Sequence, residues 1–371
     1  MIHVHRPYIG SEEKEAVARV LDSRWLGMGS FTKAFEEKLR EQTGARHVFA
    51  VNTGTAALHL ALGALELDPE DEVILPSMTF VSTVQAVLAA GGRPVFCEVS
   101  DKTLNMDIDD AFARVTSRTK VILPVHYAGL PCDMDMILSK ARPLGIKVIE
   151  DAAHAFGSSY KGRMVGSLGD MTCFSFDPIK NITCGGGGAV TTDDDGFAKI
   201  INTTRNVGME SDSWERINNE KNWHYDIVSS GFRYCMSNLN AAIGLEQLLR
   251  FNDFKKRKQS IVARYDEAFD GIDWLGLLPH DPEGVFPFSY VVKVKNGSRD
   301  RFILFLKDRG IGTTVQFIPN HMHKKFAEFK THLPITEKLY DEIVTLPLYY
   351  EMEDADVDMV ISSVVTFFRG E

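Results

Sequence analysis

The segment 147–192, KVIEDAAHAFGSSYKGRMVGSLGDMTCFSFDPIKNITCGGGGAVTT, decides the fold class of this chain. It contains three short apolar or β-branched runs, KVIEDA, MTCFSF and GGAVTT. Upstream of it, similar runs such as HVFAVN, DEVILP, PVFCEV and KVILPVHY alternate with amphipathic stretches such as TAALHLALGAL and VSTVQAVLAAG. Such alternation is typical of a parallel or mostly parallel sheet covered by helices. The first 200 residues therefore predict an α/β fold.

The pattern changes from about Ser237 onward. Apolar residues recur at three- and four-residue spacing over 238–269, which predicts one long helix. Strand-like FSYVVKV, the helical RDRFILFLKDRG and a last amphipathic helix around DADVDMVISSVVTFF follow it. We predict a large domain over residues 1–245 and a smaller C-terminal α+β domain over 246–371, hinged by the long helix.

Composition excludes several classes of protein. The 371 residues are 44% hydrophobic and 25% charged, as in an ordinary globular protein, and the net charge of −10 disfavours binding to nucleic acid or to an anionic membrane. No apolar run approaches the roughly 18 residues that span a membrane, and the start of the chain lacks a signal-peptide pattern. The five cysteines are scattered without a CxxC pair, which disfavours disulfides and a metal site. We expect a cytoplasmic protein that holds any anionic ligand by local groups.

Ligands of open α/β sheets bind beyond the carboxyl ends of the strands, so the residues that follow each strand are the candidates. Thr53-Gly54-Thr55 follows the first strand and opens a helix, which suits a phosphate, although taken alone such a turn is more often a plain helix cap. Phe80 follows the second strand and either stacks on a flat heterocycle or belongs to the core.

Two charged residues follow later strands. Asp151 is a carboxylate at a buried strand end, where a protonated pyridine nitrogen would stabilise it, although it can also be a helix N-cap. Lys180 lies in an apolar, proline-containing turn, which would lower the pKa of its amine as a covalent nucleophile requires, whereas most lysines are surface charges. The run Gly185–Gly188 is a weak dinucleotide motif because a strand-like stretch, not a helix, follows it.

The order of these features along the chain is more specific than any one of them. A phosphate turn, an aromatic residue, an aspartate and a lysine preceded by a serine are expected, in this order, for a pyridoxal phosphate enzyme of the aspartate aminotransferase fold. The segments PVHYAG, IEDAAHAFGSSYKGR, FSFDPIKNITC, NAAIGLEQL and GIGTTVQF go further. Through them the chain resembles, over essentially its full length, the DegT/StrS-type nucleotide-sugar aminotransferases, above all the UDP-4-amino-4-deoxy-L-arabinose aminotransferases and enzymes that aminate 4-keto-6-deoxyhexoses.

The resemblance implies pyridoxal 5'-phosphate as cofactor, PLP fold type I, and a role for each matching residue. Lys180 matches the lysine that bonds to the cofactor and moves protons. Asp151 matches the partner of the pyridine nitrogen, and His154, where many relatives have Gln, matches the residue beside the ring oxygen. Phe80 matches the stacking aromatic. The phosphate contacts are matched by Gly54, Thr55 and Ser175.

The chain departs from the family pattern at three positions. Relatives are homodimers with shared active sites, and Arg233 stands where many have an Asn that reaches the partner's cofactor phosphate; a surface arginine is the alternative. Gly186 stands where the family usually has the Glu of a GEGG motif. Val207 stands where many relatives have a His. On the substrate side, the resemblance points to Tyr127 in PVHYAG and to His321, although His321 could equally be a surface histidine.

The resemblance implies transfer of an amino group from L-glutamate to a nucleotide-diphosphate-linked keto sugar, with 2-oxoglutarate as by-product and C4 as the expected position. The amino sugar would enter polysaccharides such as lipopolysaccharide O-antigen, other glycans or natural products. Two alternatives stay open. Sugar dehydratases of the same family have His in place of the lysine, which disfavours dehydration here. A non-catalytic sensor that binds cofactor or sugar is disfavoured by intact Lys180, Asp151 and Ser175.

Overall fold

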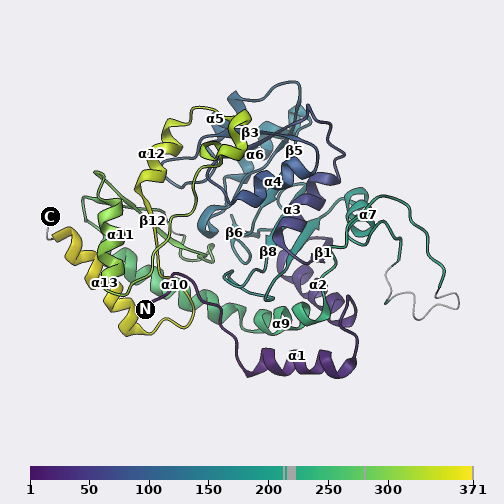
Figure 1. The fold of residues 1–371 in the computed structure, drawn as a ribbon, viewed down its shortest axis with the longest axis horizontal. Helices are drawn as coiled ribbons and strands as arrows, with labels where there is room; N and C mark the ends of the chain where they lie inside the picture. Colours follow the sequence, from purple (N-terminus) through teal and green to yellow (C-terminus); the bar gives the residue numbers. More distant parts are fainter. Residues whose placement is uncertain (212–213, 215–222, 280, 370–371) are drawn as a thin grey trace.

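The computed structural model describes residues 1–211, 214, 223–279 and 281–369. Its central feature is a seven-stranded sheet in the order β1-β9-β8-β5-β4-β2-β3 (Figure 1). The strands are β1 (His47–Val51), β2 (Glu72–Pro76), β3 (Arg93–Cys97), β4 (Thr119–Ile122), β5 (Lys147–Asp151), β8 (Met171–Ser175) and β9 (Gly188–Thr192). Within this sheet β9 runs antiparallel to both of its neighbours, and the other pairings are parallel. The prediction of a mostly parallel α/β sheet is confirmed.

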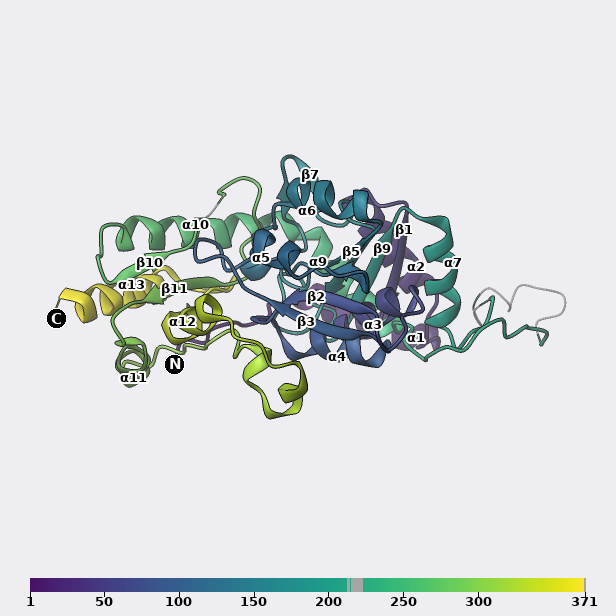
Figure 2. The ribbon, with the colours of Figure 1, turned by 90° about the horizontal axis from the view of Figure 1, so that it is seen from above.

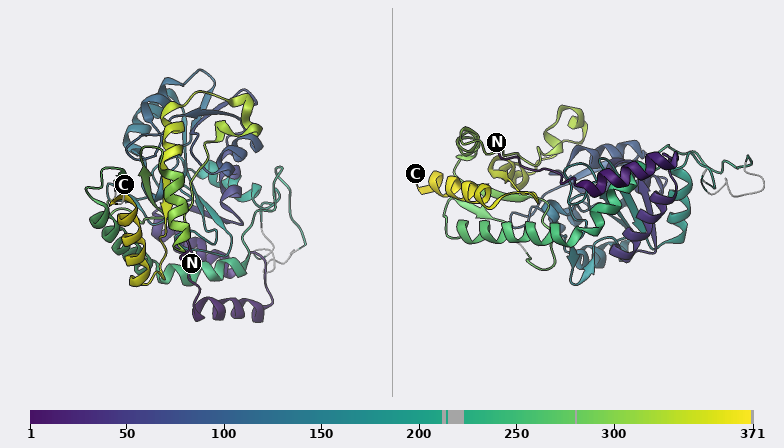
Figure 3. Two further views of the ribbon diagram at one scale, coloured as in Figure 1. Left: turned by 60° about the vertical axis from the view of Figure 1, so that its left-hand side comes forward. Right: turned by 90° about the horizontal axis from the view of Figure 1, so that it is seen from below.

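Both faces of the sheet are buried, because successive residues of a strand point to opposite faces and both are apolar. In β5, Val148 joins one core and its neighbour Ile149 joins the other. One face is covered by α2 (Ser30–Thr43), α5 (Ile108–Ala113), α6 (Met134–Ala141) and α9 (Asn238–Leu249), and the other by α3 (Gly54–Gly63), α4 (Val81–Ala89) and α7 (Asp195–Thr204). The helix α1 (Ser11–Ser23) packs on α9 (Figure 3).

A second, three-stranded antiparallel sheet lies in the C-terminal part of the chain, beside the large sheet (Figure 2). It consists of β10 (Leu275–Leu277), β11 (Tyr290–Val294) and β12 (Ile343–Leu346). The helices α10 (Phe251–Phe269), α11 (Arg299–Asp308) and α13 (Asp354–Arg369) share its core, and α12 (Pro334–Glu342) contacts β11. This sheet and its helices confirm the smaller α+β part.

Three further features complete the description. The strands β6 (Ser159–Tyr160) and β7 (Arg163–Met164) form a two-stranded hairpin. The first residues of the chain contact its C-terminal part, since Ile2 pairs with Ile311. Among the residues that the structure describes, no helix is both long enough and apolar enough to cross a membrane.

The long helix predicted over 238–269 is two helices, so that prediction was wrong. The break is at Arg250, whose φ of −103° and ψ of 6° are not helical. The Arg250 guanidinium reaches α1, where it contacts Glu12 and Glu13. The break allows α9 to pack against α1 and α2 while α10 packs against α13. The division of the chain at residues 245 and 246 stays a prediction.

Candidate functional site

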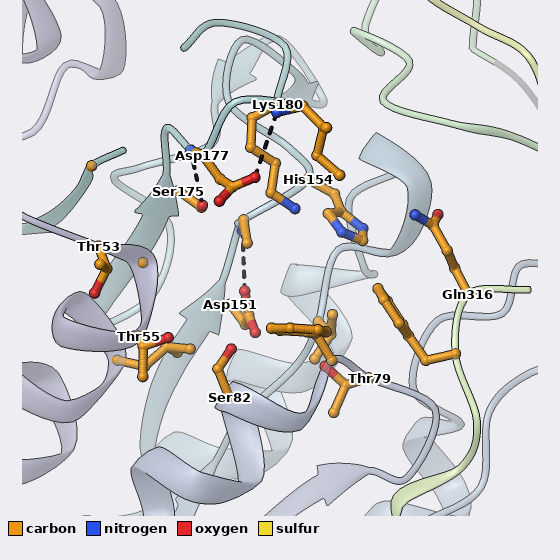
Figure 4. A pocket seen from close by; sticks show the side chains of 18 of the residues that line it. Thr53, Thr55, Thr79, Ser82, Asp151, His154, Ser175, Asp177, Lys180 and Gln316 are labelled. Carbon is orange, nitrogen blue, oxygen red and sulfur yellow. Dashed lines mark hydrogen bonds between the residues drawn. The ribbon is translucent and has the colours of Figure 1, made fainter. Parts of the chain in front are cut away.

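A cavity of about 270 Å³ opens where the carboxyl ends of β5 and β8 meet the start of α3 (Figure 4). Seven of the residues singled out in the sequence line it, together with the departure Gly186: Gly54, Thr55, Phe80, Asp151, His154, Ser175 and Lys180. They come from four separate segments of the chain. The sheet topology therefore brings the predicted residues together.

The first wall of the cavity is the N-terminus of α3. Thr53 caps this helix, and its hydroxyl accepts a hydrogen bond from the Ala56 N–H at 3.0 Å. The N–H groups of the first helical residues have no carbonyl partner within a helix, so those of Gly54 and Thr55 point out of its end. A Cβ at Gly54 would lie 2.8 Å from the Cβ of Ser175, which shows how closely α3 approaches the end of β8. The result is a group of N–H and hydroxyl donors suited to an anion.

Asp151, the last residue of β5, is a buried carboxylate. Its oxygens accept hydrogen bonds from the Thr83 hydroxyl at 2.8 Å and the Ala153 N–H at 3.1 Å. Burial raises its pKa, and these hydrogen bonds and the charge of Lys180 offset the rise only in part. A cation placed in the cavity would therefore be stabilised by this carboxylate.

Lys180 projects its amine into the cavity, on the side where Asp151 and His154 lie (Figure 4). The turn that carries it is closed by a hydrogen bond from the Lys180 N–H to the Asp177 carbonyl at 3.0 Å. Burial lowers the pKa of the amine to about 8, although the carboxylates of Asp151 and Asp177 oppose this shift. The amine thus has an appreciable neutral, nucleophilic fraction at neutral pH.

A stack of rings forms another wall. The His154 imidazole lies on Phe288 at 4.1 Å between ring centres and on Phe317 at 5.8 Å, and Phe317 is 5.7 Å from Phe80. Burial lowers the pKa of His154 well below its usual value, so the ring is neutral. Its Nδ1 is buried and has no hydrogen-bond partner among the described residues. Phe80 itself is 55% exposed, with its ring at the mouth of the cavity.

Several lining residues were missed in the sequence. Gln316 and Phe317 come from the C-terminal part of the chain, where GIGTTVQF had been noted only as a family segment. Ser82 lies in the first turn of α4, two residues after Phe80, and Asp177 lies three residues before Lys180. The proximity of Ser82 and Asp177 to predicted residues was the signal that could have found them. Nothing in the local pattern marks Gln316.

Two proposed substrate-side residues do not line this cavity. Tyr127 is buried, and its hydroxyl donates a hydrogen bond to the carbonyl of Gln316. His321 is also buried, with its ring nitrogens at 2.7 Å from the Ser77 hydroxyl and 3.1 Å from a Glu337 oxygen. Any influence of these two side chains on the cavity passes through their neighbours.

The family departures lie in different places. Gly186 lines the cavity, and a Cβ added to it would meet no atom within 4 Å. Arg233 is exposed and lies outside the cavity, in a hollow that Trp25 and Asn206 also line. Val207 has a φ of 53°, a left-handed conformation that is rare for a β-branched residue. Of the three, only Gly186 contacts the cavity within this chain.

The residues of the cavity fit the expected cofactor. Pyridoxal phosphate carries a phosphate, a pyridine nitrogen and an aldehyde, and each has a matching group here. The donors at the start of α3 suit the phosphate, the buried carboxylate of Asp151 suits a protonated ring nitrogen, and the Lys180 amine suits the aldehyde. The unpartnered Nδ1 of His154 is a further polar atom that such a ligand could meet.

Comparison with known sequences also points to an aminotransferase. The model of the DegT/DnrJ/EryC1/StrS aminotransferase family matches residues 7–365. The chain is similar to the spore coat polysaccharide biosynthesis protein SpsC of Bacillus subtilis, with 42% identity over an alignment of 375 positions that covers 98% of this chain and 96% of SpsC.

Comparison with solved structures confirms the expected fold. The putative sugar aminotransferase Spr1654 of Streptococcus pneumoniae, in its pyridoxamine phosphate form, matches with a TM-score of 0.94 and 30% identity over 100% of both chains. The aminotransferase TlmJ of Streptoalloteichus hindustanus matches with a TM-score of 0.93 and 34% identity over 100% of this chain and 99% of TlmJ. Spr1654 has also been solved in a pyridoxal phosphate form. The chain is therefore a pyridoxal phosphate-dependent enzyme and belongs to the DegT/DnrJ/EryC1/StrS aminotransferase family.

Proposed function

We propose that this enzyme transfers an amino group from L-glutamate to C4 of a nucleotide-diphosphate-linked 4-keto-6-deoxy sugar. The names of two similar proteins support a sugar acceptor, since SpsC is a polysaccharide biosynthesis protein and Spr1654 a putative sugar aminotransferase. The observation that carries the proposal is the presence of a buried, pKa-lowered Lys180 amine and the buried Asp151 carboxylate in one cavity. The amino sugar would enter a polysaccharide, a glycan such as lipopolysaccharide, or a natural product.

In this proposal Lys180 is the residue that bonds to the cofactor and carries protons. Its amine has a neutral fraction large enough to attack an aldehyde and, once released, to take a proton from a substrate carbon and return it. Bound pyridoxal phosphate supplies an electron sink for the negative charge that develops on that carbon. Asp151 supports this sink, because its charge keeps the ring nitrogen protonated.

The remaining residues orient the reactants. Gly54, Thr55 and Ser175 would hold the cofactor phosphate at the start of α3, where the helix end favours negative charge. Phe80 would stack on the pyridine ring, and the neutral His154 would contact the bound cofactor, since both side chains line the cavity.

We further propose that the enzyme is a cytoplasmic homodimer with shared active sites, in which Arg233 of one subunit reaches the cofactor phosphate of the other. An arginine pairs strongly with phosphate because its hydrogen bonds are charge-assisted. In the described chain Arg233 is exposed and lies away from its own cavity, which leaves its guanidinium available to a second copy.

The test has two stages. The loaded enzyme is first incubated with L-glutamate alone, and conversion of the cofactor from its pyridoxal to its pyridoxamine form is followed by absorbance. It is then given a panel of UDP-, dTDP- and GDP-linked 4-keto and 3-keto sugars, and the aminated product is identified by mass spectrometry and NMR.

The expected result is conversion by glutamate followed by amination at C4 of at least one 4-keto sugar, with both steps lost in Lys180→Ala. Conversion by glutamate without amination of any sugar would contradict the sugar acceptor. A cofactor that stays unchanged with glutamate would contradict the amino donor and favour the sensor alternative.

A further inference from the structure

Behind Lys180 lies a second buried amine that the proposed function does not use. Lys258 belongs to α10 and is 5% exposed. Its Nζ donates hydrogen bonds to the side-chain oxygen of Asn181 at 2.9 Å and to the carbonyl of Phe288 at 3.0 Å. Both acceptors are uncharged, and no ion pair is found for Lys258 in the described part of the chain. Burying a lysine without a carboxylate partner costs free energy of folding. Lys258 therefore needs an explanation other than stability.

Both acceptors are connected to Lys180, one through the chain and the other through a contact with its amine. Asn181 follows Lys180 directly in the chain, and its amide also donates to the Phe286 carbonyl at 3.0 Å. Phe288 turns its ring toward Lys180, whose Nζ lies 4.5 Å from the ring centre. Lys258 therefore ties the turn that carries Lys180 to the segment just before β11, where Phe288 contacts the Lys180 amine.

The two amines are also close enough to interact electrostatically. The Nζ of Lys258 is 5.8 Å from the centre of the same Phe288 ring. A small hollow of about 20 Å³, enough for about one water molecule, lies between the two lysines and the start of the chain. The titratable groups around it are His5, Arg6, Tyr8, Tyr349 and Tyr350, and none of its lining residues is an aspartate or glutamate.

The electrostatic surroundings of the pair are therefore unequal. Lys180 faces the carboxylates of Asp151 and Asp177, whereas Lys258 faces Lys180 and the neutral rings of His5 and His154. Burial and the charge of Lys180 lower the pKa of Lys258 to about 7. At neutral pH Lys258 exists in both forms, and each protonation of one amine opposes protonation of the other.

We propose that Lys258 is a positioning residue for Lys180: it fixes the Lys180 turn through Asn181 and Phe288, and its charge disfavours a proton on the nitrogen of Lys180. This inference rests on the proposed role of Lys180 as the residue that bonds to the cofactor. A positive charge on Lys258 opposes a proton on that bonded nitrogen, so a fixed charge at position 258 lowers the pH at which the nitrogen loses its proton. A neutral side chain raises that pH.

The test measures the pH midpoint of the absorbance change of the cofactor-loaded enzyme, without any sugar. The variant Lys258→Arg keeps a permanent charge, Lys258→Gln keeps a hydrogen-bond donor without charge, and Lys258→Met keeps neither. We expect the Gln and Met midpoints to lie about one pH unit above the Arg midpoint, with the wild type between them. We expect kcat to fall more in Lys258→Met than in Lys258→Gln, because only the Met variant leaves the oxygens of Asn181 and Phe288 without a hydrogen-bond donor at position 258. If Lys258→Arg does not fold, the wild type takes its place against Lys258→Gln, and the Gln midpoint should still lie above the wild-type midpoint, by a smaller difference.

The control is Lys255→Gln, on the same helix. Lys255 is partly buried and donates to the Gly157 carbonyl at 3.3 Å, but it lines neither the cavity nor the small hollow. Its midpoint should equal that of the wild type. Equal midpoints in the charged and neutral variants at position 258, with the absorbance change present, overturn this inference. A pH-dependent band that persists in Lys180→Ala instead overturns the proposed role of Lys180.

Discussion

The Lys180 amine lies 4.5 Å from the centre of the Phe288 ring, and the His154 imidazole stacks on that ring at 4.1 Å. The face of an aromatic ring attracts a cation, but it replaces only part of the hydration that an ammonium loses on burial. Burial therefore makes the neutral form of this amine more abundant than in a solvated lysine, with the pKa lowered to about 8.

The first prediction is the pH dependence of cofactor loading. A lowered pKa means that the neutral amine is about one tenth of the total at pH 7 and dominates above pH 8. The rate at which the cofactor-free protein bonds pyridoxal phosphate should rise about tenfold from pH 6 to 7, reach half of its maximum near pH 8 and level off above it. Stopped-flow absorbance measures this rate. A rise that continues toward the ordinary lysine value of 10.5 would contradict the lowered pKa.

The second prediction concerns Asp151→Asn. The amide oxygen can still accept from Thr83 or Ala153, but the charge that would keep the ring nitrogen protonated is lost. We expect kcat to fall by about a thousandfold or more, in line with loss of a main electrostatic contribution to catalysis. Steady-state assays with glutamate measure the loss, and a fall of less than tenfold would argue against the proposed role.

A stability measurement on the cofactor-free variant separates catalysis from folding. Because the folded pKa of Asp151 is raised, the folded protein holds this proton more tightly than the unfolded chain does. Stability is therefore lost as the pH rises through the unfolded pKa, and the loss is complete above the folded one. At pH 7 Asp151→Asn should melt at the same temperature as the wild type or above it, whereas at pH 3 the difference should be smaller.

The sequence predicted the parts of the site that follow strands. Asp151 and Ser175 end buried apolar runs, and the rule that parallel strands present their carboxyl ends at one edge places them together. Phe288, Gln316 and Lys258 were missed because their relevance arises from tertiary contacts over long stretches of chain. From its neighbours in the chain alone, a lysine on an amphipathic helix is predicted to be solvent-exposed, even where the fold buries it.

The helix break is the clearest failure of pattern reasoning. Apolar spacing runs through 238–269 without interruption, because both helices bury a face, although against different partners. What ends α9 is the backbone of Arg250, whose side chain contacts Glu12 and Glu13 of α1. Periodicity reports which residues are buried and carries no information on a change of direction between two such helices.

The third prediction tests the departure at Gly186. A side chain there would meet open space, and the φ of Gly186 is not in the left-handed region, so Gly186→Glu should fold with an unchanged melting temperature. Its carboxylate would enter the cavity that holds Lys180 and raise the pKa of that amine. The half-maximum of cofactor loading should move above pH 8, while Gly186→Gln, which adds the same bulk without charge, should leave it in place. Equal shifts in both variants would mean that bulk, not charge, is responsible.

The fourth prediction tests whether two copies of the chain share an active site. Lys180→Ala removes the reactive amine from one cavity, and Arg233→Ala removes the guanidinium proposed to reach the partner's cofactor phosphate. A two-fold symmetric dimer that contains one subunit of each variant has two different sites. The site in the Arg233→Ala subunit keeps both groups, and the site in the Lys180→Ala subunit lacks both. Mixing the two weakly active proteins under conditions of subunit exchange should restore about one quarter of the wild-type rate, since about half of the dimers are mixed and each has one working site.

The double variant Lys180→Ala/Arg233→Ala mixed with either single variant should restore none. If the mixture stays as inactive as its components while native mass spectrometry shows mixed dimers, Arg233 acts within its own subunit and the site is not shared in this way.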